Sequence, residues 1–298
     1  MPKRTILVSN PGSVKICTGS LEIETWRGKA RVPLEDIWVL ILESPEVSIT
    51  SAALADLCNA GIGTMLCGRN HMPSGLLLPI GAHSRHAAIV EDQLAIPKPL
   101  KKRLWQAIVK QKILNQAEAL DLMGLGKGAE LRELSKNVLS GDTNGREAAA
   151  AALYFRELTP NGGRRASSLT PALDYGYAVL RAGIARCAVG GGWLVSRGIH
   201  HCSDLNAFNL VDDLIEPFRP VVDLIVKEEC EGYPFGTQSK QALACAFSYC
   251  VELDGKRFTV ESAIEEMLES FKRAILQNDA SLLTLPSIIP LQRMTEVE

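Results

Sequence analysis

A change in the spacing of apolar residues near position 80 divides the chain into two unlike parts. Before it, short runs rich in Val, Ile, Leu and Thr alternate with turn signals such as Asn10-Pro11-Gly12, a pattern that favours strands. After Pro79 and Gly81 the segments are long, rich in Ala and Leu, and helical in period. The sequence therefore predicts an α+β protein with a small β-rich N-terminal domain, residues 1–80, and a larger all-α C-terminal domain, residues 85–298.

The Gly and Pro residues between the periodic runs place the individual elements. One helix interrupts the N-terminal strands over Ser51–Ala60, with Ser51 as its N-cap. The predicted strands are Thr5–Ser9, Ser13–Thr18, Leu21–Trp26, Ala30–Pro33, Ile37–Leu42 and Thr64–Cys67. The predicted helices of the C-terminal domain cover 86–95, 98–124, 128–139, 144–158, 171–189, 207–228, 240–252 and 260–277.

Composition indicates a folded protein rather than a disordered one. The chain has 298 residues, of which 46% are hydrophobic and 22% are charged, far from the low hydrophobicity and high charge of disordered chains. Its eight cysteines include no CxxC pair, so a zinc ribbon or a thioredoxin-type motif is not expected. No uncharged run approaches the roughly 18 residues of a membrane span, and no secretory signal pattern is found. We therefore expect a cytoplasmic protein with reduced thiols and no membrane partner.

The formal net charge of −2 conceals two regions of opposite sign. Residues 1–200 carry 24 Lys and Arg against 17 Asp and Glu, whereas residues 201–298 carry 8 against 17. The basic helix over 98–112 would turn its lysines outward, Lys110 and Lys112 included, either as a solvated face or as contacts to a DNA backbone. A flexible basic loop after residue 160 suits a surface linker and a phosphate contact equally. The candidate DNA-binding residues are Lys101, Lys102, Arg103, Arg164 and Arg165.

Two carboxylates, Asp213 and Glu216, lie three residues apart in the segment Asn206–Pro220. On a helix both would point to the same face, and two like charges held together require a cation. A plainer interpretation is that these acids only begin a helix capped by Asn209, where the helix dipole favours negative charge. Spacing alone does not decide between a cation site and a helix start.

An imidazole pair, His200 and His201, lies just upstream in a loop that follows three glycines. Histidine and carboxylates without cysteine suit Mg²⁺ or Mn²⁺ rather than structural zinc. Adjacent histidines project in different directions, so one of the two is the expected ligand and the other an interior residue. A zinc site made of these histidines and Cys202 is disfavoured, because three consecutive residues rarely enclose one tetrahedral ion.

A third carboxylate, Glu147, begins the alanine-rich run Arg146–Phe155. Small residues let a neighbouring helix approach closely and leave this carboxylate standing out from its surroundings. The alternative interpretation is a solvated glutamate in the first turn of a helix that Asn144 caps.

These residues resemble the CRISPR-associated Cas-one integrase and endonuclease family of spacer acquisition, in the form found in type II systems. The resemblance spans nearly the whole chain and rests on Arg146–Phe155, Asp174–Gly183, Gly198–His201 and Asn206–Asp223. It implies a β-rich N-terminal domain used in dimerisation, a helical catalytic domain and a bound divalent metal. By the same resemblance the metal ligands and catalytic residues are Glu147, His201 and Glu216, with Asp213, His200 and Arg219 as candidate accessory residues.

The function that the resemblance implies is insertion of short DNA duplexes into a CRISPR array by transesterification from their 3′-hydroxyl ends. A divalent metal, Mg²⁺ or Mn²⁺, would activate the attacking hydroxyl and stabilise the leaving oxygen. The implied partners are duplex DNA, a second copy of the chain, the small Cas-two protein that bridges two dimers, and other adaptation proteins of the locus. Two other functions fit the same residues: a stand-alone metal-dependent nuclease for branched DNA, and a non-catalytic DNA-binding scaffold.

Overall fold

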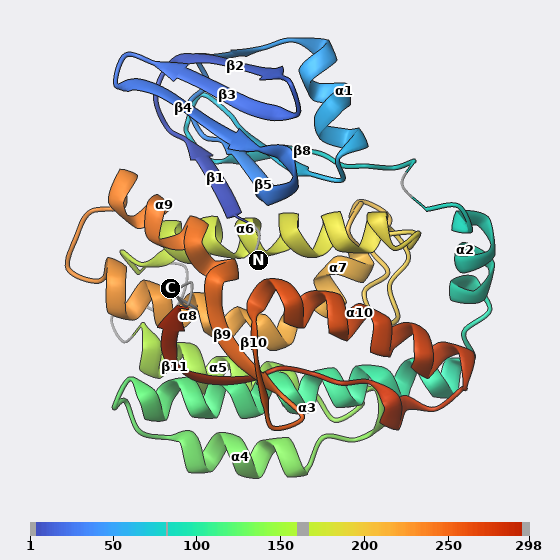
Figure 1. Ribbon diagram of the computed structural model, residues 1–298. Coiled ribbons are helices and arrows are strands. Elements are labelled where there is room, and N and C mark those ends of the chain that lie inside the picture. The colour runs from blue at the N-terminus through green and yellow to red at the C-terminus, as the bar shows by residue number, and fades with distance from the viewer. Residues whose placement is uncertain (1–3, 82, 160–166, 294–298) are drawn as a thin grey trace.

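The computed structural model describes residues 4–81, 83–159 and 167–293. Figure 1 shows a strand-rich N-terminal part above a larger, mainly helical C-terminal part. The predicted α+β fold class is therefore confirmed. Within the described ranges, every helix is too short or too polar to cross a lipid bilayer.

Two four-stranded sheets and one helix make up the N-terminal part. Its elements are β1 (Arg4–Val8), β2 (Gly12–Cys17), β3 (Ser20–Thr25), β4 (Gly28–Pro33), β5 (Ile37–Leu42), β6 (Val47–Ile49), α1 (Ser51–Asn59), β7 (Gly63–Cys67) and β8 (Pro73–Leu77). The first sheet has the order β1-β5-β7-β8, with β1, β5 and β7 parallel and β8 antiparallel at the edge. The second sheet has the order β4-β3-β2-β6.

All the predicted strands of this part and its helix are present, with two additions and one correction. The sequence pattern does not predict β6, which has only three residues, or β8, which contains Pro and Gly. The N-cap of α1 is Thr50 rather than the expected Ser51, because the Thr50 hydroxyl accepts a hydrogen bond from the backbone N–H of Ala53 at 3.2 Å. Thr50 has the extended backbone that an N-cap requires, whereas Ser51 is already helical.

Strand β5 connects the N-terminal sheet to the helical part. Leu40 and Leu42 pack in a core formed by both sheets and α1, whereas Val39 and Ile41 belong to the large core of the helical part. This alternation follows from the two-residue period of a strand. Because both faces of β5 are covered, its six residues are all apolar and all buried.

Helices dominate the C-terminal part. Its elements are α2 (His86–Leu94), α3 (Lys98–Leu122), α4 (Gly128–Lys136), α5 (Arg146–Leu158), α6 (Thr170–Gly190), α7 (Asn209–Leu214), α8 (Arg219–Ile225), α9 (Thr237–Ala244), β9 (Tyr249–Leu253), β10 (Lys256–Thr259), α10 (Val260–Leu276) and β11 (Ser287–Arg293). The 25-residue helix α3 packs against α4, α5 and α8 in the lower half of the molecule (Figure 1). It thereby forms the floor on which the site described below is built.

A three-stranded sheet in this part corrects two predictions, the all-α domain and the helix over 240–252. Helix α9 ends at Ala244, and β9 pairs antiparallel with both β10 and β11. Asp254 and Gly255 form the two-residue turn between β9 and β10, with φ of 48° and 74°. An Asp-Gly pair is a preferred sequence for such hairpins. This dipeptide is the sequence signal for a strand pair that the helical spacing around it conceals.

The predicted helix over 207–228 is divided into shorter segments. Helix α7 ends at Leu214, Glu216–Phe218 forms a 3₁₀ turn, and α8 begins at Arg219. Pro217 and Pro220 cause the division, since proline has no N–H to donate and fits only the first positions of a helical segment. Glu216 therefore lies in a turn between helices, and that turn packs on α3.

Candidate functional site

The start of α5 fixes the position of Glu147. Gly145 has φ of 63°, a left-handed conformation that leads the chain into the helix. The carboxylate of Asp142 then accepts hydrogen bonds from the backbone N–H groups of Arg146 at 2.8 Å and Glu147 at 3.1 Å. Asp142 thus accepts hydrogen bonds from the first N–H groups of the helix, the role that we expected of Asn144. The reason is that the chain turns at Gly145, which leaves Asn144 outside the helix.

Glu216 is buried, with 5% of its surface exposed, and two cations neutralise it. Its Oε1 atom accepts a hydrogen bond from Nε of Arg219 at 2.9 Å, and its Oε2 atom lies 2.5 Å from Nζ of Lys112. Burial by itself would raise the pKa of Glu216, but the charges of Lys112 and Arg219 outweigh it and lower that pKa to about 2. The carboxylate is therefore ionised at every physiological pH. Arg219 thus braces one oxygen of the Glu216 carboxylate.

Lys112 joins the two glutamates that the sequence singles out. Its Nζ lies 2.7 Å from Oε1 of Glu147 and 2.5 Å from Oε2 of Glu216. The prediction that Lys112 faces outward is wrong, since its exposed fraction is 9%. Burial would lower the pKa of Lys112, yet Glu216 and Glu147 together raise it. The signal that could have found it is helical spacing, because residue 112 lies on the same face as buried Trp105 and Ile108.

Asp213 organises the loop that carries the histidines. Its buried carboxylate accepts hydrogen bonds from the backbone N–H groups of Ile199 at 2.7 Å, His200 at 3.1 Å and His201 at 3.0 Å. The Nδ1 atom of His201 lies 2.7 Å from the same carboxylate. Gly198 is required beside it, because a Cβ there would lie 2.5 Å from Oδ2 of Asp213. Both oxygens of Asp213 are thus engaged with the loop, and Asp213 is not a free carboxylate.

Asn209 supports the same loop instead of capping a helix. Helix α7 begins at Asn209 itself, and its side-chain amide donates hydrogen bonds to loop carbonyls. The acceptors are the carbonyl oxygens of Ser196, Ser203 and Asn206, at 2.9–3.1 Å. The expected N-cap is therefore wrong, because the Asn209 side chain points back toward the loop rather than along the new helix.

The two adjacent histidines have different surroundings. The His200 ring stacks on the Trp105 indole, with centroids 4.1 Å apart and planes 3° from parallel, whereas His201 meets the same indole edge-on. The hydrogen bond to Asp213 is the main reason that the pKa of His201 is raised, and Glu216 contributes through its charge. With Nδ1 bonded to a carboxylate, Nε2 is the ring nitrogen that keeps a lone pair for another ligand. His201 therefore has a ring nitrogen suited to a further ligand. The prediction that the other histidine lies in the interior is wrong, because His200 covers the Trp105 indole from outside and is itself exposed.

A buried tyrosine and aspartate network lies behind Arg219. The Arg219 guanidinium lies over the Tyr177 ring, 4.7 Å from its centroid. The hydroxyls of Tyr177 and Tyr154 donate to the two oxygens of Asp223, at 2.5 Å and 2.8 Å. These residues lie on α5, α6 and α8. The network thus ties together the helices that flank Glu147 and Glu216.

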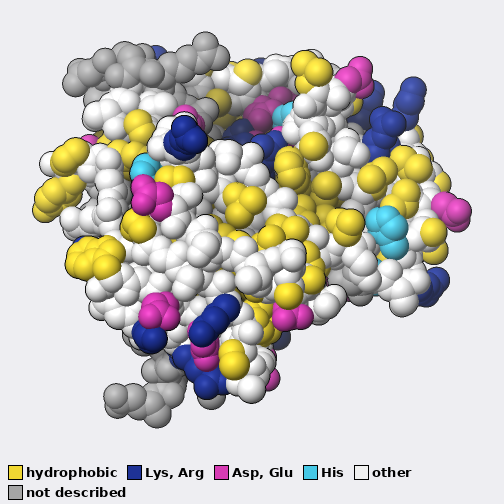
Figure 2. Space-filling view, turned by 90° about the horizontal axis from the view of Figure 1, so that it is seen from above, with side chains coloured by type: hydrophobic (Ala, Val, Ile, Leu, Met, Phe, Trp, Pro, Cys, Tyr) yellow, Lys and Arg dark blue, Asp and Glu magenta, His cyan; other side chains and the backbone are white. Residues whose placement is uncertain are grey.

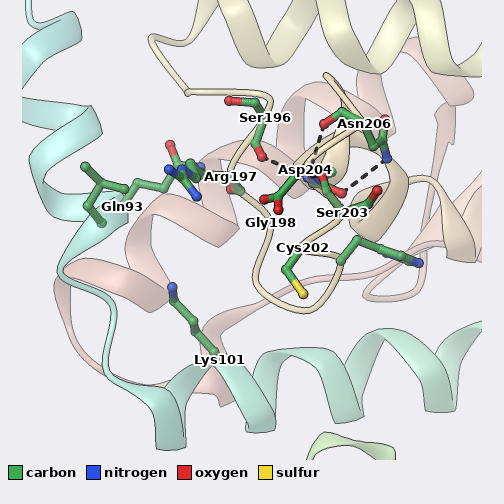
Figure 3. Close-up of a pocket in the computed structure, with 12 residues that line it drawn as sticks. Gln93, Lys101, Ser196, Arg197, Gly198, Cys202, Ser203, Asp204 and Asn206 are labelled. Carbon is green, nitrogen blue, oxygen red and sulfur yellow. Dashed lines mark hydrogen bonds between the residues drawn. The ribbon is translucent and has the colours of Figure 1, made fainter.

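The predicted DNA-binding residues fall in different places. Lys101 lines a cavity of about 430 Å³ together with His201, Arg197 and Gln93. Figure 3 shows Lys101 rising from α3 toward the loop that carries Ser196, Cys202 and Ser203. Lys102 and Arg103 are exposed and do not line this cavity. Arg164 and Arg165 lie outside the described residues.

Basic side chains do not form a single patch on the face shown in Figure 2. Lys and Arg are dispersed there among acidic and apolar side chains. A recess of this face contains acidic, basic and histidine side chains together. The opposite net charges of the two sequence regions therefore do not become two separate surfaces on this face.

The arrangement of acidic and histidine side chains tests the expected metal site. Among the described residues, no three His, Cys, Asp or Glu side chains form a group that could hold a metal ion. Glu147, His201 and Glu216 therefore do not surround one point. The two glutamates, however, already share one cation, the Lys112 ammonium. Carboxylate oxygens are the ligands that Mg²⁺ and Mn²⁺ prefer, so this pair fits such an ion chemically, and His201 lies on the adjacent loop outside the pair.

The fold is one that solved Cas1 structures share. Among the solved structures it resembles are a casposase bound to integration product (TM-score 0.76, 16% identity, covering 94% of this chain and 93% of that one) and a CAS1 protein from Thermotoga maritima (TM-score 0.73, 17% identity, 92% and 97%). A third is a Cas6-RT-Cas1–Cas2 complex (TM-score 0.72, 16% identity, 100% of this chain and 37% of that one). At these identities the likeness establishes the fold.

Sequence comparison gives the family itself. The family model described as CRISPR associated protein Cas1 matches residues 6–232. A CRISPR-associated endonuclease Cas1 of Neisseria meningitidis serogroup C (strain 8013) is 40% identical over 299 residues, covering 98% of both chains. The chain belongs to the Cas1 family, and the family prediction made from its motifs is confirmed.

Proposed function

We propose that this chain is a metal-dependent integrase and endonuclease that inserts short DNA duplexes into a CRISPR array by transesterification from their 3′-hydroxyl ends. Its membership of the Cas1 family gives the general function, DNA integration and cleavage in CRISPR adaptation. The observation that carries the proposal is the convergence of Glu147 and Glu216, from separate helical segments, on one cation. Carboxylates that share a cation are the arrangement that metal-assisted phosphoryl transfer uses.

The proposed metal ligands and catalytic residues are Glu147, His201 and Glu216, and the proposed ion is Mg²⁺ or Mn²⁺. The ligand atom assigned to His201 is Nε2, because Nδ1 is engaged with Asp213. An ion held there would lower the pKa of the attacking 3′-hydroxyl and offset negative charge on the phosphoryl oxygens.

Other residues of the chain position this set. Asp213 holds His201 and its loop through hydrogen bonds to three backbone N–H groups and one ring nitrogen. Arg219 fixes one oxygen of Glu216, and Tyr177 supports the Arg219 guanidinium from behind. His200 holds the loop against α3 by stacking on Trp105. Lys101, in the cavity beside His201, is the proposed contact to a DNA phosphate.

The proposed partners are duplex DNA, a second copy of the chain and the small Cas2 protein that bridges two dimers. The names of two similar structures, a casposase bound to integration product and a Cas6-RT-Cas1–Cas2 complex, support DNA and Cas2 as partners. We assign dimerisation to the β-rich domain 1–80 and catalysis to the helical domain 85–298. A cytoplasmic location is supported by the cysteines, since all eight lie among the described residues and each is free. Other adaptation proteins of the locus stay predicted partners.

A joining assay tests the function. The protein and its Cas2 partner would be incubated with duplex DNA and a supercoiled array plasmid in Mg²⁺ or Mn²⁺. Glu216→Gln keeps the shape of the side chain, and we expect it to reduce joining about 100-fold or more. The matched control is Glu133→Gln on α4, an exposed glutamate paired with Lys136, which should join at the wild-type rate.

Each alternative function gives a different result in the same assay. Full joining by a folded Glu216→Gln protein would overturn the ligand assignment. Metal-dependent cleavage of branched DNA without any joining would identify a stand-alone nuclease. DNA binding that is unchanged by EDTA and by loss of the carboxylates, with no cleavage, would identify a scaffold.

A further inference from the structure

Lys112 has an uncommon environment for a lysine. Its side chain is almost wholly buried on α3, and its ammonium contacts two carboxylates from two other segments. Lysine is almost never buried without a partner, since a buried charge must be paired. Its neighbour Lys110, two residues earlier on the same helix, forms no ion pair within the described part of the chain and is only partly buried. Lys112 is thus the lysine that α3 turns inward, and the two carboxylates compensate the charge that this burial would otherwise leave unpaired.

We propose that Lys112 is an exchangeable cation of the active site: a divalent metal ion takes its place between Glu147 and Glu216, and the released ammonium binds a phosphate of the DNA. This inference rests on the proposed function for its metal and its substrate. It adds a catalytic residue to the three acidic and histidine ligands. It also explains how the buried Glu216 and the partly exposed Glu147 are stable side by side.

Geometry requires the exchange. The ammonium nitrogen lies 2.7 Å and 2.5 Å from the two carboxylate oxygens, so it occupies the space between them. An ion with ligand distances of about 2.1 Å needs that same space. Arg219 bonds the other oxygen of Glu216, at 2.9 Å, and need not move. Only the flexible lysine stem has to swing away, whereas the Arg219 guanidinium is held by the Tyr177 ring.

Charge indicates where the released ammonium goes. Glu147 and Glu216 carry two negative charges, and Lys112 and Arg219 carry two positive charges, so the group is formally neutral. A divalent ion adds two positive charges, and a phosphodiester with an ionised 3′-oxygen adds two negative ones. The group stays neutral only if the Lys112 ammonium remains in it. A buried ammonium that has lost its carboxylates needs another anion, and the DNA phosphate is the anion that the reaction supplies.

The test compares Lys112→Met with the matched control Lys110→Met, which removes the same charge from the same helix. Three quantities would be measured for each variant. They are the Mn²⁺ affinity, by electron paramagnetic resonance; the melting temperature, in EDTA and in Mn²⁺; and the rate of joining at saturating Mn²⁺. We expect Lys112→Met to bind Mn²⁺ about tenfold more tightly, because its competitor is gone. We expect it to melt at a lower temperature than wild type in EDTA and to gain more from Mn²⁺. Its joining should fall about 100-fold, because the phosphate loses its cation.

Opposite changes in affinity and rate are the signature of exchange. If Lys112 only stabilised the fold, Lys112→Met would bind Mn²⁺ more weakly as well as join more slowly, and that result overturns the inference. Lys112→Arg keeps the charge and protects the test against simple misfolding: it should bind Mn²⁺ no more tightly than wild type, and tighter binding would contradict competition. If the wild type joins DNA in a Mn²⁺-dependent way and Lys112→Met joins at the same rate, the role of Lys112 is refuted while the proposed function stands. Failure of the wild type to bind Mn²⁺ or to join would instead refute the proposed function.

Discussion

Replacing Asp213 with Asn tests whether a buried carboxylate positions the catalytic loop. Asp213 is fully buried and accepts hydrogen bonds from three successive backbone N–H groups, those of residues 199–201. It also holds Nδ1 of His201 at 2.7 Å. Asn has almost the same shape but one acceptor oxygen, and its amide N–H₂ group faces donors. The substitution therefore leaves the volume of the core unchanged while it removes acceptors from the loop.

The size of the effect follows from these contacts. Two hydrogen bonds end on each oxygen of Asp213, so conversion of one oxygen to N–H₂ removes two charge-assisted bonds. Each such bond contributes about 1.5 kcal/mol or more, so the free energy of unfolding should fall by roughly 3 kcal/mol. For a chain of this length that is a decrease of about 6 °C in melting temperature. Loss of the partner that orients His201 should weaken Mn²⁺ binding and joining by about 10- to 100-fold.

The assay combines calorimetry, Mn²⁺ binding, joining and the pKa of His201 followed by NMR. Asp213 is the main reason that this pKa is raised, so the pKa of His201 should fall in the Asn variant. Asp212→Asn is the matched control: its carboxylate pairs with Arg181 at 2.5 Å and accepts from the Asn206 side chain at 2.7 Å. It holds no backbone N–H of residues 199–201, so joining should fall less. If Asp213→Asn joined DNA at the wild-type rate with an unchanged His201 pKa, the positioning role would be refuted.

Two further predictions concern stability. The first concerns Glu216, whose pKa is about 2, below its ordinary value of 4.5. A carboxyl group whose pKa is lowered in the folded state stabilises the protein at pH values above its pKa in the unfolded state. This contribution disappears as the pH falls from about 4.5 toward 2. Urea unfolding should therefore show that the free energy of unfolding of the wild type falls by roughly 3 kcal/mol across that pH range. The decrease should be smaller in Glu216→Gln, and equal decreases would contradict this role of Glu216. The second prediction concerns Lys240 on α9, which lies 2.6 Å from buried Glu43, a residue that follows β5. Lys240→Met should lower the free energy of unfolding by about 3 kcal/mol, because it leaves a buried charge unpaired. The double variant with Glu43→Gln should recover part of this loss, and additive losses would argue against a direct pair.

Much of the fold was accessible from local sequence pattern. The N-terminal strands and most helices lie within a few residues of their predicted bounds, because apolar spacing and turn residues are properties of neighbours in the chain. The errors occur where two local signals compete. The Tyr249–Leu253 segment continues a helical spacing, yet the Asp-Gly turn after it makes a hairpin. The 207–228 segment has helical spacing throughout, yet Pro217 and Pro220 divide it.

For the candidate site, the sequence alone determined which residue types are available and which family they belong to. The motifs around Glu147, His201 and Glu216 single out these residues, although nothing in their spacing shows that the two glutamates meet. The tertiary structure alone decided that Lys112 lies between them and that Asp213 is committed to the histidine loop. The physical reason is that a buried charge takes its partners from whatever segments the packing brings near. Here those segments are α3, α5 and the turn before α8, which are distant in the sequence and adjacent only in the folded chain.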